Sequence, residues 1–412
     1  NILVEVTMVL GIIAEYNPFH NGHLYHILKS KSISKDDYVV AIISGNFSQR
    51  GEPSLIDKWV KAEMALSCGV DLVIELPTIY SISSAENFAD GAIKILNSLK
   101  IIDHLSFGAE CAELNKLNII ANVLYKEPKY YKTLLANNLK KGISFPKARA
   151  SAVGSYLNNP SFSNILSEPN NILAIEYLKA LKKHKSNIEP ILIERKNSGH
   201  LNPDYTGTFT SSSSIRNMIK NGHFSKLKDG LTPSSYTILK EEISNGNFVT
   251  DLAEFEKIIL YNLRLMPAYK IKNLPDVSEG LENSIKKAAF SCNTLEEFMN
   301  IVCTKRYTKT RINRILLYSL LGITKKDMLI SKRISPYIRV LGFSENGKSL
   351  LGKLNNSGLN VITSVKKFLD TNNNKNLENL INEDILATNV YTLALKGTFP
   401  GNLDLSKRIV TK

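Results

Sequence analysis

Short apolar segments separated by stretches of helix length constrain the fold of this chain more than any other feature. Three apolar runs, Val9–Glu15, Tyr38–Ser44 and Val70–Leu76, are followed by a shorter strand-like segment, His104–Phe107. Continuous apolar strands that alternate with helices are typical of a parallel sheet covered on both faces. We therefore predict an α/β fold with a Rossmann-like parallel sheet, and such sheets bind ligands beyond the carboxyl ends of their strands.

The alternation stops near Gly230. Residues 251–263, 279–290, 294–303 and 308–321 are each predicted to form a helix. We predict two domains, an α/β domain over residues 8–230 and a mostly helical domain over residues 231–412. Within the second part, Tyr337–Gly342 is predicted to be a strand.

The charge of the chain is strongly basic and unevenly distributed. Lysine and arginine total 52 against 38 aspartate and glutamate, a formal charge of +14. Between residues 301 and 340, one acid, Asp327, stands against ten basic side chains: Lys305, Arg306, Lys309, Arg311, Arg314, Lys325, Lys326, Lys332, Arg333 and Arg339. A general excess for solubility would be spread along the chain, so this concentration favours a polyanionic partner such as a nucleic acid.

Several classes of protein are disfavoured by composition. No apolar run approaches the ~20 residues of a membrane helix, so no membrane association is predicted. The four cysteines are widely spaced and form no C-x-x-C pair, which favours reduced thiols in a cytoplasmic protein over zinc or disulfides. Residues 1–7 lack the basic region of a signal peptide, and Met8 is an alternative start, which leaves open whether residues 1–7 are native.

A histidine motif follows the first predicted strand. His20 and His23 are separated by Asn21 and Gly22, at the expected start of a helix. A helix N-terminus presents free N–H groups, glycine allows a phosphate to approach the backbone, and imidazoles can donate to phosphate oxygens. His26 continues the same helix face. No cysteine or further histidine has zinc-ligand spacing, so no metal site is predicted, and the motif indicates phosphate chemistry.

An H-x-G-H motif after the first strand resembles the nucleotidyltransferase superfamily that also includes class I aminoacyl-tRNA synthetases. That superfamily has a second phosphate motif, commonly I-S-S-T-x-I-R, and Thr210–Arg216 (TSSSSIR) resembles it, with Thr210 and Ser213 departing from the pattern. The hydroxyl of Ser212 at a helix start can bind phosphate, and Arg216 can neutralise leaving pyrophosphate. The alternative is a serine-rich helix cap.

A narrower resemblance covers nearly the whole chain. The matching strings are Gly11–Tyr25 (GIIAEYNPFHNGHLY), Ser44–Lys58 (SGNFSQRGEPSLIDK), Asp71–Pro77 (DLVIELP), Ser106–Glu110 (SFGAE), Glu168–Leu173 (EPNNIL) and Arg306–Leu321. They resemble the bacterial tRNA(Met) cytidine acetate ligase family. The resemblance implies a nucleotidyltransferase-like ATP-binding catalytic domain followed by a helical tRNA-binding domain.

The resemblance also implies site residues. The family's ATP-binding stretch falls on Ile13, Ala14, Glu15, Tyr16, Asn17, Pro18, Phe19, His20, Asn21, Gly22, His23, Leu24, Tyr25 and His26, with His20 and His23 as the catalytic pair. Single matching positions are Gly108, Asn171 and Arg195, and Asn170 is an alternative to Asn171. A glycine at a strand end leaves room for a base or ribose, an asparagine can bind hydroxyl or amide edges, and an arginine can reach a phosphate.

The implied reaction has two steps. Acetate attacks ATP to give acetyl-adenylate and pyrophosphate, and the acetyl group then passes to the wobble cytidine of elongator tRNA(Met), forming N4-acetylcytidine. Mg²⁺ is expected as a charge partner of ATP. Beyond the site, Asn46 or Gln49 is a candidate for recognising a carboxylate or cytosine. Arg50, Arg311 and Arg314 are candidates for contacting tRNA phosphates.

Two alternatives come from other function classes. An H-x-G-H site also fits an enzyme that transfers a nucleotide to a small phosphate ester, although a small substrate does not require a basic second domain. A non-catalytic RNA-binding protein with a vestigial nucleotide site is disfavoured because His20, His23 and Arg216 are all present. The strictness for acetate, the tRNA identity elements and the oligomeric state are not determined by the sequence.

Overall fold

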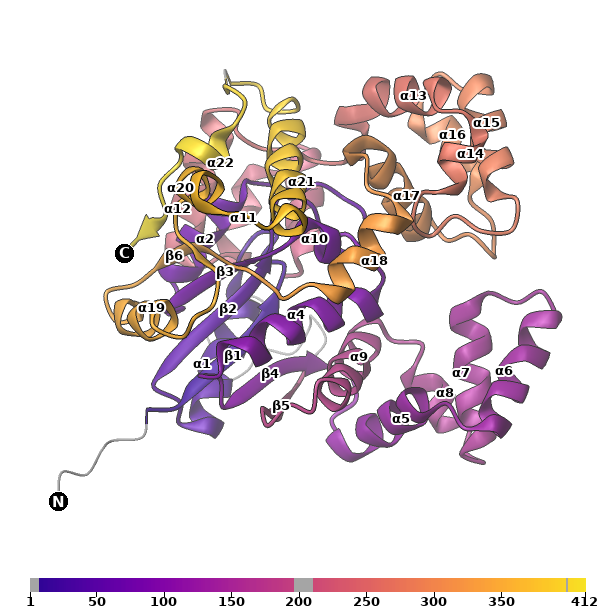
Figure 1. Cartoon of the computed structure of the whole chain (residues 1–412), viewed down its shortest axis with the longest axis horizontal. Helices are drawn as coiled ribbons and strands as arrows, with labels where there is room; N and C mark the ends of the chain where they lie inside the picture. Colours follow the sequence, from indigo (N-terminus) through magenta and orange to yellow (C-terminus); the bar gives the residue numbers. More distant parts are fainter. Residues whose placement is uncertain (1–6, 196–209, 398) are drawn as a thin grey trace.

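One mixed sheet forms the centre of the molecule in the computed structural model, which describes residues 7–195, 210–397 and 399–412 (Figure 1). Its first five strands are β1 Val9–Ala14, β2 Tyr38–Ser44, β3 Leu72–Leu76, β4 His104–Ala109 and β5 Glu189–Glu194. These strands are parallel and lie in the order β5-β4-β1-β2-β3. The predicted α/β fold class with a parallel sheet is confirmed.

The C-terminal part of the chain completes the same sheet. Strand β6 (Ile338–Phe343) runs antiparallel to β3, and the short strands β7 (Val361–Ile362) and β8 (Val410–Thr411) pair in parallel with β6. The strand predicted at Tyr337–Gly342 is therefore β6. The domain division at residues 230 and 231 remains a prediction, and the sheet draws strands from both sides of it.

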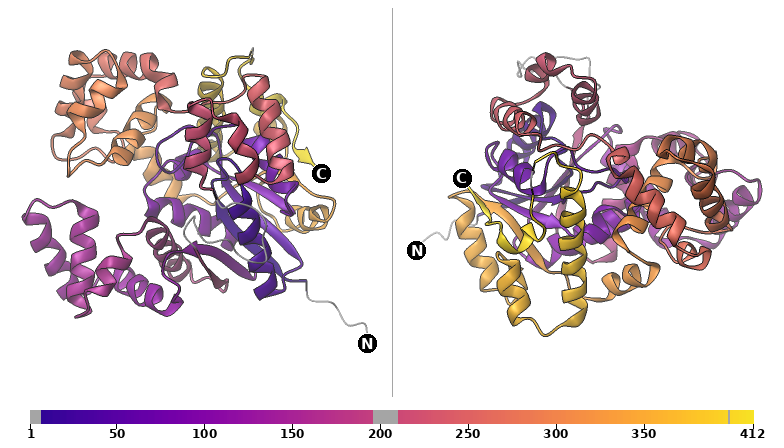
Figure 2. Two further views of the ribbon diagram at one scale, coloured as in Figure 1. Left: turned by 180° about the vertical axis from the view of Figure 1, so that it is seen from behind. Right: turned by 90° about the horizontal axis from the view of Figure 1, so that it is seen from above.

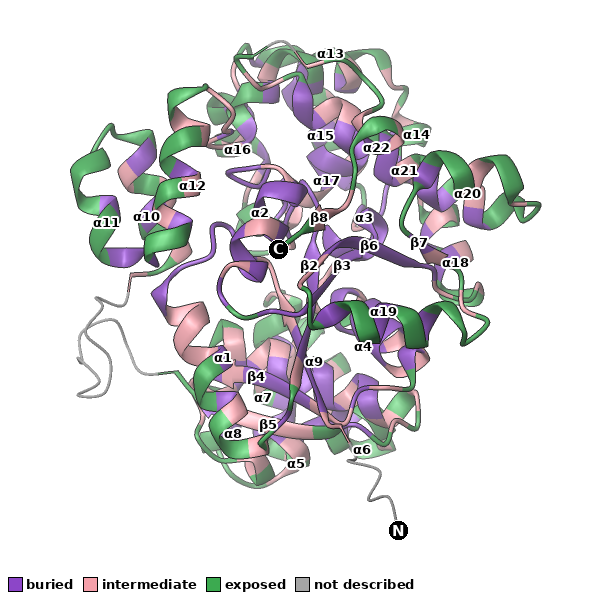
Figure 3. Cartoon of the chain, turned by 90° about the vertical axis from the view of Figure 1, so that its left-hand side faces the viewer, coloured by how far each residue is buried: buried purple, intermediate pink, exposed green. Residues whose placement is uncertain are grey.

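Alternate residues of the central strands enter two separate apolar cores. Leu10, Val39 and Ala41 pack on one face of the sheet, whereas Val40 and Ile42 pack on the other. Because both faces are covered, the strands are apolar throughout instead of alternating with polar residues. Figure 3 shows β3 coloured as buried, and β2 is buried in the same way after Tyr38.

The helices between the strands of the first half of the chain are α1 Asn21–Ser34, α2 Lys58–Leu66, α3 Thr78–Ser81, α4 Ala85–Leu99, α5 Leu114–Lys126, α6 Lys129–Lys140, α7 Phe145–Tyr156, α8 Ser161–Ile165 and α9 Pro169–Lys183. They are followed by α10 Ser212–Lys220, α11 Leu227–Gly230, α12 Pro233–Ser244, α13 Glu256–Leu265, α14 Ala268–Lys272, α15 Leu281–Ser291, α16 Leu295–Val302, α17 Lys309–Leu321 and α18 Lys325–Arg333. The last helices are α19 Gly347–Asn355, α20 Val365–Thr371, α21 Lys375–Thr392 and α22 Leu403–Ser406, and two short 3₁₀ helices span Phe224–Lys226 and Leu252–Phe255.

Two groups of helices project from the same side of the sheet. One group contains α5 to α8 and the other α13 to α17, and Figure 2 shows both from behind and from above. Among the described residues, no helix combines the length and the apolar character that crossing a membrane would require.

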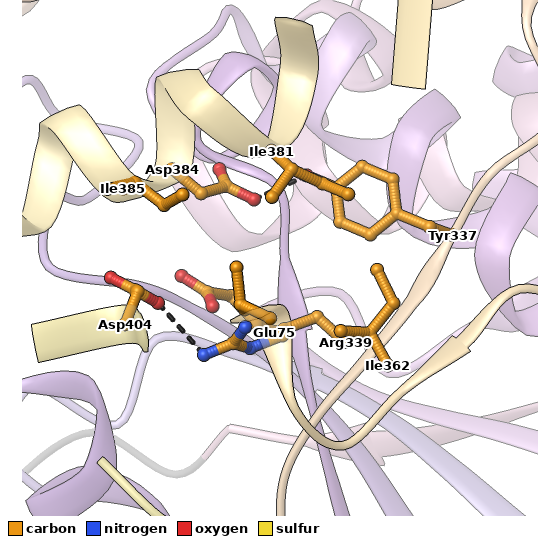
Figure 4. Close-up of a pocket in the computed structure, with 9 residues that line it drawn as sticks. Glu75, Tyr337, Arg339, Ile362, Ile381, Asp384, Ile385 and Asp404 are labelled. Carbon is orange, nitrogen blue, oxygen red and sulfur yellow. Dashed lines mark hydrogen bonds and ion pairs between the residues drawn. The ribbon is translucent and has the colours of Figure 1, made fainter. Parts of the chain in front are cut away.

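A buried cluster of charges fastens the C-terminal helices to the sheet (Figure 4). Lys58 Nζ lies 2.9 Å from Glu75 of β3 and 2.7 Å from Asp404 of α22. Arg339 of β6 lies 2.9 Å from the same Asp404, and Asp384 of α21 accepts the Thr78 N–H at 2.7 Å. Glu75, Arg339, Asp384 and Asp404 line a cavity of about 10 Å³. Burial raises the pKa of Glu75 to about 7, even though Lys58 opposes that rise.

Candidate active site

The H-x-G-H segment lies where the direction of the strand order changes. From β1 the chain adds β2 and β3 on one side of the sheet and then β4 and β5 on the other. The carboxyl end of the strand at such a switch point is the usual ligand site of an open α/β sheet. The stretch from Ile13 to His26 begins in the last residues of β1, crosses the loop and enters α1.

His20 and His23 hold one another at the start of α1. His20 is the helix cap, and its Nδ1 accepts the Gly22 N–H at 3.0 Å. The His20 N–H in turn donates to Nδ1 of His23 at 3.2 Å, and the two rings stack with centroids 3.7 Å apart. Because both Nδ1 atoms are acceptors, each neutral imidazole carries its proton on Nε2. The stacked pair therefore carries two Nε2–H donors at the start of the helix.

Both imidazoles are neutral at physiological pH. Burial lowers the pKa of His20 to about 3, and the positive charge of Arg195 contributes to the lowering. Burial, followed by the charges of His20, Arg195 and His26, holds the pKa of His23 well below its usual value. Each neutral imidazole retains its Nε2–H, which can donate a hydrogen bond to a phosphate oxygen.

Aromatic rings fix the position of His23. Tyr16 and Phe19 are buried, with ring centroids 4.7 Å apart, and their rings lie 4.9 Å and 5.4 Å from that of His23. Leu24 and Tyr25 follow on α1 as half-buried residues. These aromatic members of the predicted ATP stretch support the histidine pair from the protein side.

The third histidine of the motif turns toward the sheet. His26 Nε2 lies 2.8 Å from Ser106 Oγ on β4, and Ser106 Oγ lies 2.6 Å from Ser30 Oγ. Burial lowers the pKa of His26 to about 4. His26 therefore joins α1 to β4 and is engaged separately from the stacked pair.

The second motif packs directly on the first. Arg216 of α10 donates to the Asn17 carbonyl at 3.0 Å and pairs with Glu52 at 3.2 Å. Ser212 Oγ lies 3.4 Å from the Pro18 carbonyl, so the first turn of α10 also faces the loop after β1. On the other side of that loop, Asn21 Nδ2 donates to the Asp229 carbonyl at 3.0 Å. The structure thus brings the two motifs together across almost two hundred residues of sequence.

A second group of predicted residues lies at the ends of β4 and β5. A Cβ on Gly108 would lie 3.1 Å from Cγ of Arg195, so glycine lets the arginine cross the strand end. Arg195 Nη1 reaches Asn170 Oδ1 at 3.4 Å. Asn171 is buried, with Oδ1 accepting the Cys111 N–H at 2.8 Å and Nδ2 donating to a carbonyl at 3.1 Å. Of the two asparagines, Asn170 is the one whose amide faces Arg195.

Comparison with known proteins identifies the family. The sequence model of the HIGH Nucleotidyl Transferase family matches residues 7–402. A protein of Thermoanaerobacter sp. named tRNA(Met) cytidine acetate ligase is 46% identical over 398 residues, which span 96% of this chain and 98% of that protein. A Caldanaerobacter subterraneus protein of the same name is 45% identical over 97% of this chain and 99% of its own length.

This chain belongs to the tRNA(Met) cytidine acetate ligase family. A solved Thermotoga maritima structure, described as TmcAL bound with alpha-thio ATP, superimposes with a TM-score of 0.92 at 33% identity, covering 98% of this chain and 99% of the other. The apo form of the same Thermotoga protein gives a TM-score of 0.93 at 34% identity. The family resemblance seen in the sequence is confirmed, together with the nucleotidyltransferase-like fold.

Lys61 is a residue of this ligase-family site that the sequence analysis did not single out. It is fully buried, and Nζ donates to the carbonyls of Glu15, Ser44 and Gly45 at 3.0, 2.6 and 2.8 Å. Burial lowers its pKa to about 7, although nearby carboxylates oppose the shift. Lys61 ties the loop after β1 to the loop after β2. The available signal was a second lysine, three residues after Lys58, in a helix that is mostly apolar apart from Glu63.

The loop after β2 is held by its own polar side chains. Asn46 is buried, donating to Thr388 at 3.1 Å and accepting the Lys58 N–H at 2.9 Å, so its amide is occupied within the protein. Gln49 donates from its backbone to Glu15 at 2.8 Å and from its side chain to the Ser83 carbonyl at 3.2 Å. Asn46 is therefore a structural residue, and Gln49 joins the site to the segment before α4.

Two arginines that were expected to contact tRNA are bonded to Asp276 within the protein. Arg311 donates twice to the Asp276 carbonyl, at 2.9 and 2.7 Å. Arg314 lies 2.8 Å from the Asp276 carboxylate with its side chain only 11% exposed. Arg339, another member of the basic segment, is buried in the charge cluster. Other basic residues of this segment are exposed, among them Lys305, Lys309, Lys326, Lys332 and Arg333.

Proposed function

We propose that this protein is an ATP-dependent tRNA(Met) cytidine acetate ligase. The observation that carries the proposal is the stacked His20–His23 pair, with two Nε2–H donors at the switch point of the sheet and Arg216 packed against the same loop. Relatives that share 40–46% identity with the chain over nearly its whole length bear this name. A tRNA substrate also leads us to expect a cytoplasmic location.

In the first step, an oxygen of acetate attacks the α-phosphorus of ATP. The bond between the α-phosphorus and the bridging oxygen breaks, and pyrophosphate leaves with the bonding electrons. The Nε2–H groups of His20 and His23 donate to oxygens on which negative charge grows, and a prepositioned donor of this kind typically contributes about 10²–10³ in rate. Arg216 and the start of α10 provide positive charge for the leaving pyrophosphate.

In the second step, the exocyclic N4 amine of the wobble cytidine in elongator tRNA(Met) attacks the acetyl carbonyl carbon. The carbonyl carbon releases AMP, and the nitrogen loses one proton, which leaves N4-acetylcytidine. The acyl group passes from one substrate to the other, so no covalent enzyme intermediate is required. The neutral histidines fit a role as hydrogen-bond donors in the first step.

We propose that ATP contacts the stretch from Ile13 to His26, with Gly108, Asn170 or Asn171, Arg195, Ser212 and Arg216. The carboxylates near this site already have partners: Glu15 accepts the Gln49 N–H, Glu52 pairs with Arg216, and Glu110 accepts from Asn170 and Asn171. The described residues contain no cluster of three metal-ligating side chains. Mg²⁺ therefore fits here as an ion carried by the ATP phosphates, where it supplies charge neutralisation.

The test is exchange of labelled pyrophosphate into ATP, measured with acetate present or absent and with tRNA present or absent. We expect exchange that requires acetate and does not require tRNA. A small-molecule nucleotidyltransferase would instead show exchange that requires a phosphate ester and ignores acetate. A non-catalytic RNA-binding protein would show no exchange under any of these conditions.

A further inference from the structure

A second cavity lies away from the histidine pair, between the sheet and the helical group. Its volume is about 330 Å³, and its lining comes from α4, α17, α18 and the loop after α14. Figure 1 shows α18 between α4 and α17. The volume falls in the ~300–1,000 Å³ range of small-ligand pockets, and such pockets often lie between structural units.

One face of α18 forms the floor of this pocket. Lys325, Met328, Leu329 and Lys332 line it, at helix positions i, i+3, i+4 and i+7. A rise of 1.5 Å per residue places the two lysines roughly 10 Å apart along the helix. Leu329 is 57% exposed, although it is a large apolar side chain. Lys325 Nζ donates to the carbonyls of Lys272 and Val277 at 2.7 and 2.8 Å, whereas Lys332 Nζ makes no such bond to the described residues. The floor is thus an apolar strip with an available cation, Lys332, at one end.

The other walls add a polar group and no free negative charge. Asp276 is paired with Arg314, and the Tyr318 hydroxyl donates to the Ile82 carbonyl at 2.9 Å. Glu86, next to Asn87, is paired with Lys179 at 2.8 Å. The side-chain amide of Asn87 lines the pocket and makes no hydrogen bond to any of the described residues. A ligand with a flat apolar body, a hydrogen-bonding edge and a negative group at one end would match these walls.

The pocket is on the side of the sheet where the chemistry occurs. Asn87 lies in the first turn of α4, after the carboxyl end of β3. The segment between β3 and α4 is joined to the histidine loop through Gln49, which donates to Ser83 and to Glu15. The pocket and the histidine loop therefore lie at the same end of the sheet, which is where an RNA substrate must approach.

We propose that this pocket binds one unstacked nucleotide of the tRNA, other than the cytidine that is acetylated. The base lies on Leu329, its edge bonds to Asn87, and a flanking phosphate meets Lys332. Sequence-specific RNA recognition generally uses splayed bases of loops, with basic groups at the phosphates. This inference rests on the proposed tRNA substrate and assigns that substrate a second point of recognition.

The test uses an RNA stem-loop with the tRNA(Met) anticodon sequence, and copies in which each loop base in turn is removed. For the parent protein we expect one abasic position, other than the cytidine, to weaken binding about tenfold or more, because the apolar contact with Leu329 and the hydrogen bond to Asn87 are both lost. The double variant Asn87→Ala, Leu329→Ala should bind the intact RNA about tenfold more weakly. That variant should bind the intact RNA and the RNA that lacks the recognised base with equal affinity.

Lys326→Ala is the matched control, since Lys326 is exposed on the same helix and does not line the pocket. It should weaken binding of all the RNAs by the same factor. The inference is overturned if the missing base weakens RNA binding by the pocket variant as much as it weakens binding by the parent. It is also overturned if no abasic position other than the cytidine weakens binding by the parent. Acetate-dependent pyrophosphate exchange without RNA should be unchanged in the pocket variant, and its absence in the parent would refute the proposed function instead.

Discussion

Replacing Lys58 by methionine should destabilise the fold strongly, because its ammonium group is the cation shared by Glu75 and Asp404. All three side chains are at most 2% exposed, so water cannot replace the lost partner. Asp404 keeps Arg339 at 2.9 Å, whereas Glu75 loses its only ion-pair partner among the described residues. Removing one partner of a buried pair typically costs about 3–5 kcal/mol. We expect a loss of that size in the free energy of unfolding, measured by urea denaturation near neutral pH.

The pH dependence of this loss has a defined sign. Burial raises the pKa of Glu75 to about 7 in the parent, and without Lys58 it should rise further. A carboxyl with a raised folded pKa stabilises the fold while protonated, and this contribution is lost as the pH rises through the folded pKa. Near pH 5 Glu75 is protonated in both proteins, so the destabilisation by Lys58→Met should be smaller at about pH 5 than at about pH 8.

The double variant Lys58→Met, Glu75→Gln is the matched control. It removes both opposite charges. Replacing a buried ion pair by uncharged side chains often changes the free energy of unfolding little. It should recover most of the lost free energy and most of the added pH dependence. A single variant that is equally destabilised at both pH values, or a double variant as unstable as the single one, would refute this account of the cluster.

Three further predictions concern the site and the basic segment. His23→Ala should reduce acetate-dependent pyrophosphate exchange by about 10²–10³, because it removes a donor to the α-phosphate, while His223→Ala, an exposed histidine, should match the parent. His20→Asn retains a helix cap without an imidazole. Burial lowers the pKa of His20 to about 3, so the stabilisation contributed by the neutral imidazole is complete above about pH 6.5 and is lost toward pH 3. The His20→Asn variant should therefore lose less free energy of unfolding on acidification than the parent. Arg314→Ala should lower the free energy of unfolding by about 1–3 kcal/mol and leave the salt dependence of tRNA binding unchanged, since its guanidinium is paired with Asp276.

Local patterns were sufficient to predict the sheet and the histidine motif. The strands are apolar on both faces, so each is a continuous run in the sequence, and the paired caps of His20 and His23 depend on groups within three residues. Interactions between residues this close in the chain can be predicted from the local sequence pattern. The position of the motif after β1 then follows from the alternation of strands and helices.

Contacts between distant residues were not predictable in the same way. Arg311 and Arg314 counted as free cations in the sequence, yet their partner Asp276 lies 35 and 38 positions away. Arg339 contributed to the same excess and proves to be buried beside Asp404. Lys61 donates to the Glu15 and Gly45 carbonyls, which lie 46 and 16 positions away, so its role in joining two loops of the site depends on contacts of the same kind. Charge counted along a chain measures the available cations, and only the packing shows which of them face a partner.

The central claim is that free acetate, activated by ATP, is the source of the acetyl group. The most direct measurement is the formation of N4-acetylcytidine in tRNA(Met) with labelled acetate and ATP, run beside a reaction that contains acetyl-CoA and no ATP. The account predicts labelled product, together with AMP and pyrophosphate, only in the first reaction. Product from acetyl-CoA without ATP would contradict it, because the stacked histidines and Arg216 would then have no adenylation to perform.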